Sequence, residues 1–82
     1  MKQILYFSAE WCSPCKSLKP LVQDVAKNLG THITYIDVDM SPSLKDSYGI
    51  TSVPTIIVEN NGQQTFRRSG LMSRQDLIAA FS

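Results

Sequence analysis

The segment Trp11-Cys12-Ser13-Pro14-Cys15-Lys16 is the starting point for interpreting this chain. Its two cysteines are separated by two residues, at the predicted junction between a strand over Lys2–Phe7 and a helix. This spacing allows the two sulfurs to meet in a small ring. It also puts the first sulfur near a helix N-terminus, where unpaired N–H groups and the helix dipole favour a thiolate.

A thiolate is the nucleophile of disulfide exchange, and a second thiol nearby can resolve the mixed disulfide. The motif therefore predicts reversible dithiol–disulfide exchange by Cys12 and Cys15. Inert buried thiols are a weaker interpretation, because they need neither the adjacent proline and tryptophan nor a helix start. Zinc is also disfavoured, since a tetrahedral site takes four ligands and His32 is the single histidine. Only a cluster shared between two chains would remain, so we expect no metal.

Length and composition indicate one globular domain over residues 1–82, with 43% hydrophobic residues. The formal net charge of +1 predicts neither a nucleic-acid partner nor an anionic membrane surface. No apolar run approaches the roughly 18 residues of a membrane span, and the N-terminus lacks a secretory pattern. We therefore expect a cytoplasmic protein, in which a close cysteine pair is more often catalytic than structural.

The segments around the motif alternate between strand and helix patterns. Lys2–Phe7 holds consecutive large apolar residues, as in a strand covered on both faces. The helix is predicted from Ser13 or Pro14 to Leu29, with a kink at Pro20 and a stop at Gly30. Its predicted buried face consists of Leu18, Leu21, Val22, Val25, Ala26 and Leu29.

The rest of the chain adds three strands and two helices. The final helix is predicted over Arg74–Phe81, with Ser73 as N-cap, Asp76 completing a capping box, and Leu77, Ile78 and Phe81 facing the sheet. Before it come a strand at His32–Val38, a helix at Ser43–Tyr48, a buried strand at Ile56–Val58 after Pro54, a turn at Asn60–Gly62 and an edge strand at Gln64–Arg68. Arg67 and Arg68 are interpreted as charges that protect this edge. The order βαβαββα predicts an α/β sandwich: a four-stranded mixed sheet flanked by three helices.

With these elements in place, the chain resembles the thioredoxin family over nearly its whole length. A bare CxxC is a weak signal, but W-C-x-P-C-K followed by V-P-T is specific. The residues that carry the resemblance are Ala9–Lys16, Pro20, Tyr48-Gly49-Ile50, Val53-Pro54-Thr55, Gly62 and Gly70.

The resemblance implies a role for each matching residue. Cys12 would be the attacking thiolate, and the more buried Cys15 would resolve the mixed disulfide. Pro54 would follow a cis peptide bond, and the backbone of Val53 would pair with the client as a short strand. The flat apolar patch that docks partners would comprise Trp11, Pro14, Val53, Pro54 and Gly70, with Ser13 and Lys16 in supporting positions.

Three departures from the family pattern stand out. Family members usually begin with a further strand and helix, whereas this chain begins at the central strand. Tyr6 occupies the position of the family's buried acid, and Tyr35 that of the lysine often paired with it. Both tyrosines are expected to be packing residues. We therefore expect a single, simple titration for Cys12, while the proton acceptor for Cys15 is left open between water and the leaving thiolate.

The leading hypothesis is a monomeric thioredoxin-like protein-disulfide reductase with no cofactor of its own. Its partners would be disulfide-containing client proteins and a flavoprotein of the thioredoxin reductase type. A glutaredoxin-like, glutathione-dependent carrier is one alternative, favoured by the short chain but opposed by the Trp-Cys-Ser-Pro-Cys-Lys loop. A binding or processivity module that uses the patch without the thiols is the other.

Overall fold

The computed structural model describes residues 1–82 and has the predicted order βαβαββα. All seven predicted elements are present, with ends that differ from the prediction by one or two residues at most. The elements are β1 (Lys2–Ser8), α1 (Ser13–Leu29), β2 (Ile33–Asp37), α2 (Pro42–Ser47), β3 (Thr55–Asn60), β4 (Gln63–Ser69) and α3 (Arg74–Phe81). No helix has both the length and the apolar character needed to cross a membrane.

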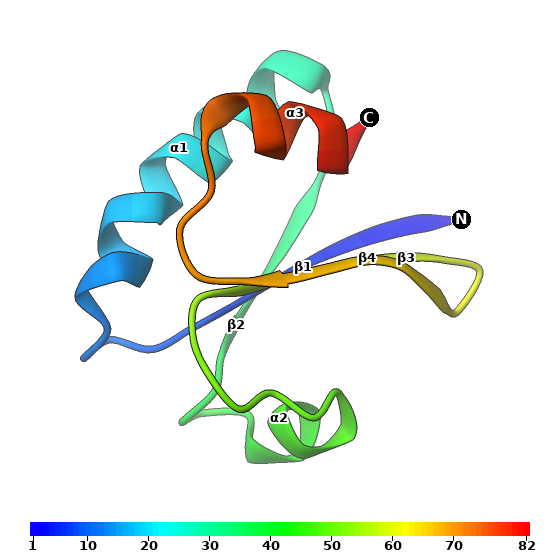
Figure 1. The fold of residues 1–82 in the computed structure, drawn as a ribbon. Helices are drawn as coiled ribbons and strands as arrows, with labels where there is room; N and C mark the ends of the chain where they lie inside the picture. Colours follow the sequence, from blue (N-terminus) through cyan, green and yellow to red (C-terminus); the bar gives the residue numbers. More distant parts are fainter.

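The four strands form one mixed sheet in the order β2-β1-β3-β4. β1 pairs with β2 in parallel, and β3 is antiparallel to both β1 and β4. In Figure 1, α1 and α3 lie together on one side of the sheet and α2 lies on the other. The three layers confirm the predicted α/β sandwich, and the parallel strands β1 and β2 both end near the start of α1.

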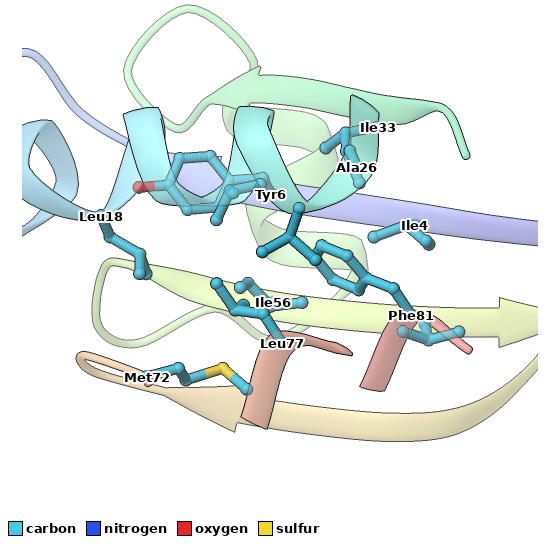
Figure 2. Close-up of a cluster of buried hydrophobic side chains, with 12 residues drawn as sticks. Ile4, Tyr6, Leu18, Ala26, Ile33, Ile56, Met72, Leu77 and Phe81 are labelled. Atoms are coloured by element: carbon cyan, nitrogen blue, oxygen red, sulfur yellow. The ribbon is translucent and has the colours of Figure 1, made fainter. Parts of the chain in front are cut away.

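The first apolar cluster fills the space between the sheet and helices α1 and α3 (Figure 2). Val22 and Leu77 are completely buried there, and full burial of one such side chain stabilises the fold by roughly 1.5–3 kcal/mol. This α1–α3 cluster consists of Ile4, Tyr6, Leu18, Val22, Val25, Ala26, Ile33, Ile56, Val58, Met72, Leu77 and Phe81.

The second apolar cluster lies on the opposite face of the sheet, beside α2. Successive residues of β1 divide between the two clusters, because side chains alternate along a strand. Ile4 and Tyr6 enter the α1–α3 cluster, whereas Leu5 and Phe7 enter the second, so β1 is covered on both faces as predicted. This α2-side cluster consists of Leu5, Phe7, Ala9, Cys12, Cys15, Ile36, Val38, Ile50 and Ile57.

Local signals set several element ends. The Ser73 hydroxyl accepts from the N–H of Asp76, whose carboxylate accepts from the N–H of Ser73, so the predicted capping box is present. Asn61 and Gly62 both have positive φ and form the predicted tight turn between β3 and β4. Gly30 ends α1 in the left-handed conformation, as expected for a C-terminal stop.

Two residues predicted on buried faces are exposed, and a third, Leu21, is half-buried. Leu29 is 42% exposed because it is the last residue of α1. Ile78 is 39% exposed because the short helix α3 buries only the stripe through Leu77 and Phe81, which are four residues apart. Pro20 lies inside a single continuous helix, and a kink there stays a prediction.

Candidate active site

Cys12 and Cys15 form a disulfide at the start of α1, with their Cα atoms 5.3 Å apart. Cys12 is the N-cap residue, and its sulfur accepts a hydrogen bond from the N–H of Cys15 at 3.2 Å. Pro14 occupies the first turn, where its missing N–H costs no helical bond. The sequence thus folds so that the first sulfur takes the place of a capping oxygen.

The start of α1 favours negative charge on Cys12. The first turn carries no acidic residue, so nothing there opposes the positive end of the helix dipole. On reduction, the Cys15 N–H can donate to a Cys12 thiolate in the same geometry. Both cysteines are buried at 4% and 2% exposure, but only Cys12 occupies the cap. The two sulfurs are therefore chemically unequal.

The loop before β3 lies against this sulfur. The Val53–Pro54 peptide bond is cis, in agreement with the resemblance, and the Val53 carbonyl oxygen is 3.7 Å from Cys12 Sγ. Neither the N–H nor the C=O of Val53 takes part in a backbone hydrogen bond. Pro54 is buried, whereas Val53 is half-buried. An unpaired segment of backbone therefore borders the disulfide.

A groove of about 150 Å³ lies between Trp11 and Val53. Trp11 is 69% exposed, and its indole N–H donates to the carboxylate of Asp39 at 2.8 Å. Asp39 follows β2 and fixes an indole that belongs to the loop before α1. The sequence does not mark this residue as part of the site, because Asp39 looks like an ordinary turn residue and its partner is 28 positions away.

The remaining predicted site residues are partly gathered here. Gly70 donates its N–H to the Pro54 carbonyl at 2.9 Å, so the turn after β4 adjoins the proline. Pro14 and Ser13 are exposed in the first turn of α1. Lys16, also exposed, lines a different cavity from the Trp11–Val53 groove. The structure thus assembles Trp11, Val53, Pro54 and Gly70 beside the disulfide, and leaves the docking role of each a prediction.

Tyr6 and Tyr35 lie beside Cys15, at the positions where the family has a buried acid and a lysine paired with it. The completely buried Tyr6 donates its hydroxyl proton to the Cys15 carbonyl at 2.7 Å. The pKa of Tyr6 is raised to about 12, mainly by burial and to a smaller extent by the neighbouring Tyr35. The Tyr6 hydroxyl therefore remains a neutral donor. The Tyr35 ring packs edge-on against Tyr6, with centroids 5.8 Å apart, and Lys19 Nζ lies 5.2 Å from the Tyr35 ring centroid.

A cavity of about 330 Å³ adjoins Cys15 at the carboxyl ends of β1 and β2. Its lining carries two amines, Lys16 and Lys19, and two carboxylates, Glu10 and Asp37. The Asp37 carboxylate accepts from the N–H of Asp39 at 2.8 Å and thus belongs to the turn after β2. Nowhere in residues 1–82 do His, Cys, Asp and Glu side chains gather in a group of three or more that could hold a metal ion.

A disulfide at the start of a helix, bordered by a cis-proline loop on this α/β fold, defines a thiol–disulfide oxidoreductase. The sequence matches the family described as Thioredoxin over residues 1–82. The chain belongs to the thioredoxin family, which confirms the resemblance seen in the sequence.

Individual relatives agree with this assignment. A thioredoxin of Rickettsia bellii is 36% identical over 74 residues, which are 88% of this chain and 70% of that protein. A thioredoxin of Chlamydia trachomatis is 37% identical over 81 residues, covering 96% and 78% of the two chains. Among solved structures, a mutant thioredoxin from Halobacterium salinarum superposes with a TM-score of 0.89 at 31% identity, covering 98% of this chain and 71% of that one. Thioredoxin 1 of Thermosipho africanus gives 0.85 at 32% identity, covering 95% and 88%.

Proposed function

We propose that this thiol–disulfide oxidoreductase is a protein-disulfide reductase, with Cys12 as the attacking and Cys15 as the resolving residue. The observation that carries the proposal is the position of Cys12 Sγ, which caps α1 and lies 3.7 Å from the Val53 carbonyl oxygen. The cap favours the thiolate, and the loop offers free backbone groups next to it.

The reaction transfers two electrons to a client disulfide. The Cys12 thiolate attacks one client sulfur, forming a mixed disulfide and releasing the other sulfur as a thiolate. Cys15 then loses its proton to water or to the released thiolate and attacks Cys12 Sγ. The Cys12–Cys15 disulfide forms, the second client sulfur leaves as a thiolate, and protons from solvent complete the reduced client.

Client recognition would use the backbone as well as the apolar surface. The unpaired N–H and C=O of Val53 can accept an extended client segment as a short added strand. Trp11 presents an exposed ring fixed by Asp39, and Pro14 and Gly70 add exposed surface near the same sulfur. Main-chain pairing suits an enzyme that acts on many different protein disulfides.

A dithiol must be regenerated after each turnover. We assign that step to a flavoprotein of the thioredoxin reductase type, acting on a monomeric carrier in the cytoplasm. Glutathione is the competing donor, and the two donors can be separated directly. No cofactor bound to the chain enters the proposed reaction.

Insulin reduction tests the proposal. We expect the wild-type protein with thioredoxin reductase and NADPH to reduce insulin disulfides at a multiple of its rate with glutathione and glutathione reductase. Replacing both Cys12 and Cys15 by serine should abolish the reaction while leaving the circular dichroism spectrum unchanged. Equal turnover with glutathione would instead assign the glutaredoxin-like role. If the double serine variant retained the biological effect of the protein, the chain would be a binding module.

A further inference from the structure

Strand β4 contacts the loop 50–54 that borders Cys12, and it does so near both ends of that loop. At the downstream end, the Ser69 and Thr55 hydroxyls lie 2.8 Å apart, and Thr55 donates to the Ser52 carbonyl at 2.7 Å. The N–H of Gly70, just after β4, donates to the Pro54 carbonyl. This end of the loop is therefore tied to residues 69 and 70.

The upstream end is tied by Arg67. Its Nη1 donates to the Tyr48 carbonyl at 2.6 Å and its Nη2 to the Gly49 carbonyl at 2.9 Å. These carbonyls follow the last turn of α2, where the helix leaves C=O groups without intrahelical partners and the dipole is negative. A guanidinium suits the place because its planar group presents two N–H donors side by side.

We propose that Arg67 is a positioning residue for client binding: it fixes the end of α2 and so sets where the Val53 backbone lies relative to Cys12. Only residues 50–52 separate Gly49 from Val53, and the first of them, Ile50, is buried in the α2-side cluster. A short connection anchored at Gly49 and at Pro54 leaves Val53 little freedom. The inference rests on the proposed function, since it concerns the binding of a protein client.

Arg68 provides a matched control. It follows Arg67 directly, but its side chain forms an ion pair with Asp76 of α3 at 3.4 Å and has no bond to α2 or to loop 50–54. Its side chain is about half exposed, at 48%. The sequence interpretation of both arginines as edge charges is therefore incomplete, because one braces α2 and the other pairs with α3. Removing either one deletes the same charge from the same strand.

Arg67→Gln and Arg68→Gln should be compared in insulin reduction coupled to thioredoxin reductase, at a temperature where both are folded. For Arg67→Gln we expect KM for insulin to rise about tenfold with kcat within about twofold, as loss of two charge-assisted hydrogen bonds loosens the loop. Arg68→Gln should leave both constants within about twofold of wild type. A small aromatic disulfide, which needs Cys12 but no backbone pairing, should react equally with all three reduced proteins. Arg67→Lys, with one cationic donor group, should recover part of the loss in KM.

Each other result has a definite meaning. An Arg67→Gln variant whose KM matches that of Arg68→Gln overturns the inference and leaves the proposed function intact. Parallel loss of reactivity toward the small disulfide also overturns it, because Arg67 would then act on the Cys12 site as a whole. A wild-type protein that does not reduce insulin overturns the proposed function itself, and the inference with it. Should Arg67→Gln fail to fold, Arg67→Lys carries the same comparison.

Discussion

The two apolar clusters on opposite faces of the sheet are built from the same strands but differ in what they contain. The α1–α3 cluster is a packing core of aliphatic and aromatic side chains whose one polar group, the Tyr6 hydroxyl, is hydrogen-bonded. The α2-side cluster includes both cysteines and Ile50, which begins the loop leading to the cis-proline. One face therefore holds the fold together, and the other also carries the chemistry.

This difference implies that substitutions of similar size should have different consequences on the two faces. The α1–α3 cluster contains neither cysteine, so a cavity among its aliphatic side chains should lower stability alone. A cavity in the α2-side cluster should lower stability and also move the loop or the cysteines. Any variant of the α1–α3 cluster that folds but has altered catalysis would contradict this functional distinction between the two clusters.

Leu77→Ala should have the largest effect on stability. Leu77 is completely buried in the α1–α3 cluster, and truncating such a leucine removes buried methyl groups and leaves a cavity. We expect the free energy of unfolding to fall by about 4 kcal/mol, measured by urea denaturation. Activity per folded molecule should stay within about twofold of wild type. Leu71→Ala, at a site 61% exposed, is the control and should cost less than about 0.5 kcal/mol.

Ile50→Ala makes the corresponding cavity on the other face. Ile50 is 4% exposed in the α2-side cluster and is the first residue of the loop that reaches Val53. We expect a loss of about 3 kcal/mol in stability together with a several-fold rise in KM for insulin. Denaturation and steady-state kinetics on the same preparation measure both. If KM stayed at the wild-type value, the functional distinction between the clusters would fail at this residue.

Tyr6→Phe tests the polar group of the first cluster through pH. In wild type, the pKa of Tyr6 is raised from its usual value of 10.0 to about 12, chiefly by burial. Between these values the unfolded chain gives up the proton first, so stability present below pH 10 is lost as pH rises toward 12. At about 1.4 kcal/mol per pKa unit, the full loss is roughly 2.7 kcal/mol, and about half of it is reached at pH 11. The Tyr6→Phe variant should not lose this part of its stability as pH rises, as measured by urea denaturation at pH 7 and pH 11.

Tyr35→Phe is the control for Tyr6→Phe. The pKa of Tyr35 is also raised by burial, but the residue is 40% exposed, so removing its hydroxyl should change the loss of stability at alkaline pH less. At pH 7, Tyr6→Phe should cost about 1 kcal/mol through loss of the hydrogen bond to the Cys15 carbonyl. If the free energy of unfolding fell equally with rising pH in wild type and in Tyr6→Phe, the Tyr6 hydroxyl would not be the group that lowers stability in this pH range.

The sequence was a good guide where the signal was local. Helix α3 was predicted to the residue because Ser73 and Asp76 mark its start, and the cysteine pair was found from its spacing and its proline. The contacts of Asp39 with Trp11 and of Arg67 with the end of α2 were not predictable, because they join side chains to distant segments. A periodic pattern tells which face a side chain occupies but not which distant atom it meets.

The cis bond before Pro54 shows the same limit in another form. Most X–Pro bonds are trans, so local chemistry alone would have favoured trans, and the prediction depended on the family resemblance. At Ile78 the local pattern itself gave a wrong prediction, because an eight-residue helix buries fewer side chains than the pattern indicates. The α1–α3 cluster was thus easier to predict than the α2-side cluster, whose loop is shaped by contacts between segments far apart in the chain.

Ser73→Ala should have a smaller effect than either cavity variant and tests whether such local signals matter on their own. Ser73 is exposed and outside both clusters, yet its hydroxyl accepts from the Asp76 N–H at the start of α3. Loss of this cap should cost about 1 kcal/mol in urea denaturation. Ser73→Asn, which can cap the same N–H, should recover most of it. Because the cap holds only the helix that covers the α1–α3 cluster, KM and kcat for insulin should not change. A rise in KM here would mean that the face assigned to packing also shapes the loop beside Cys12.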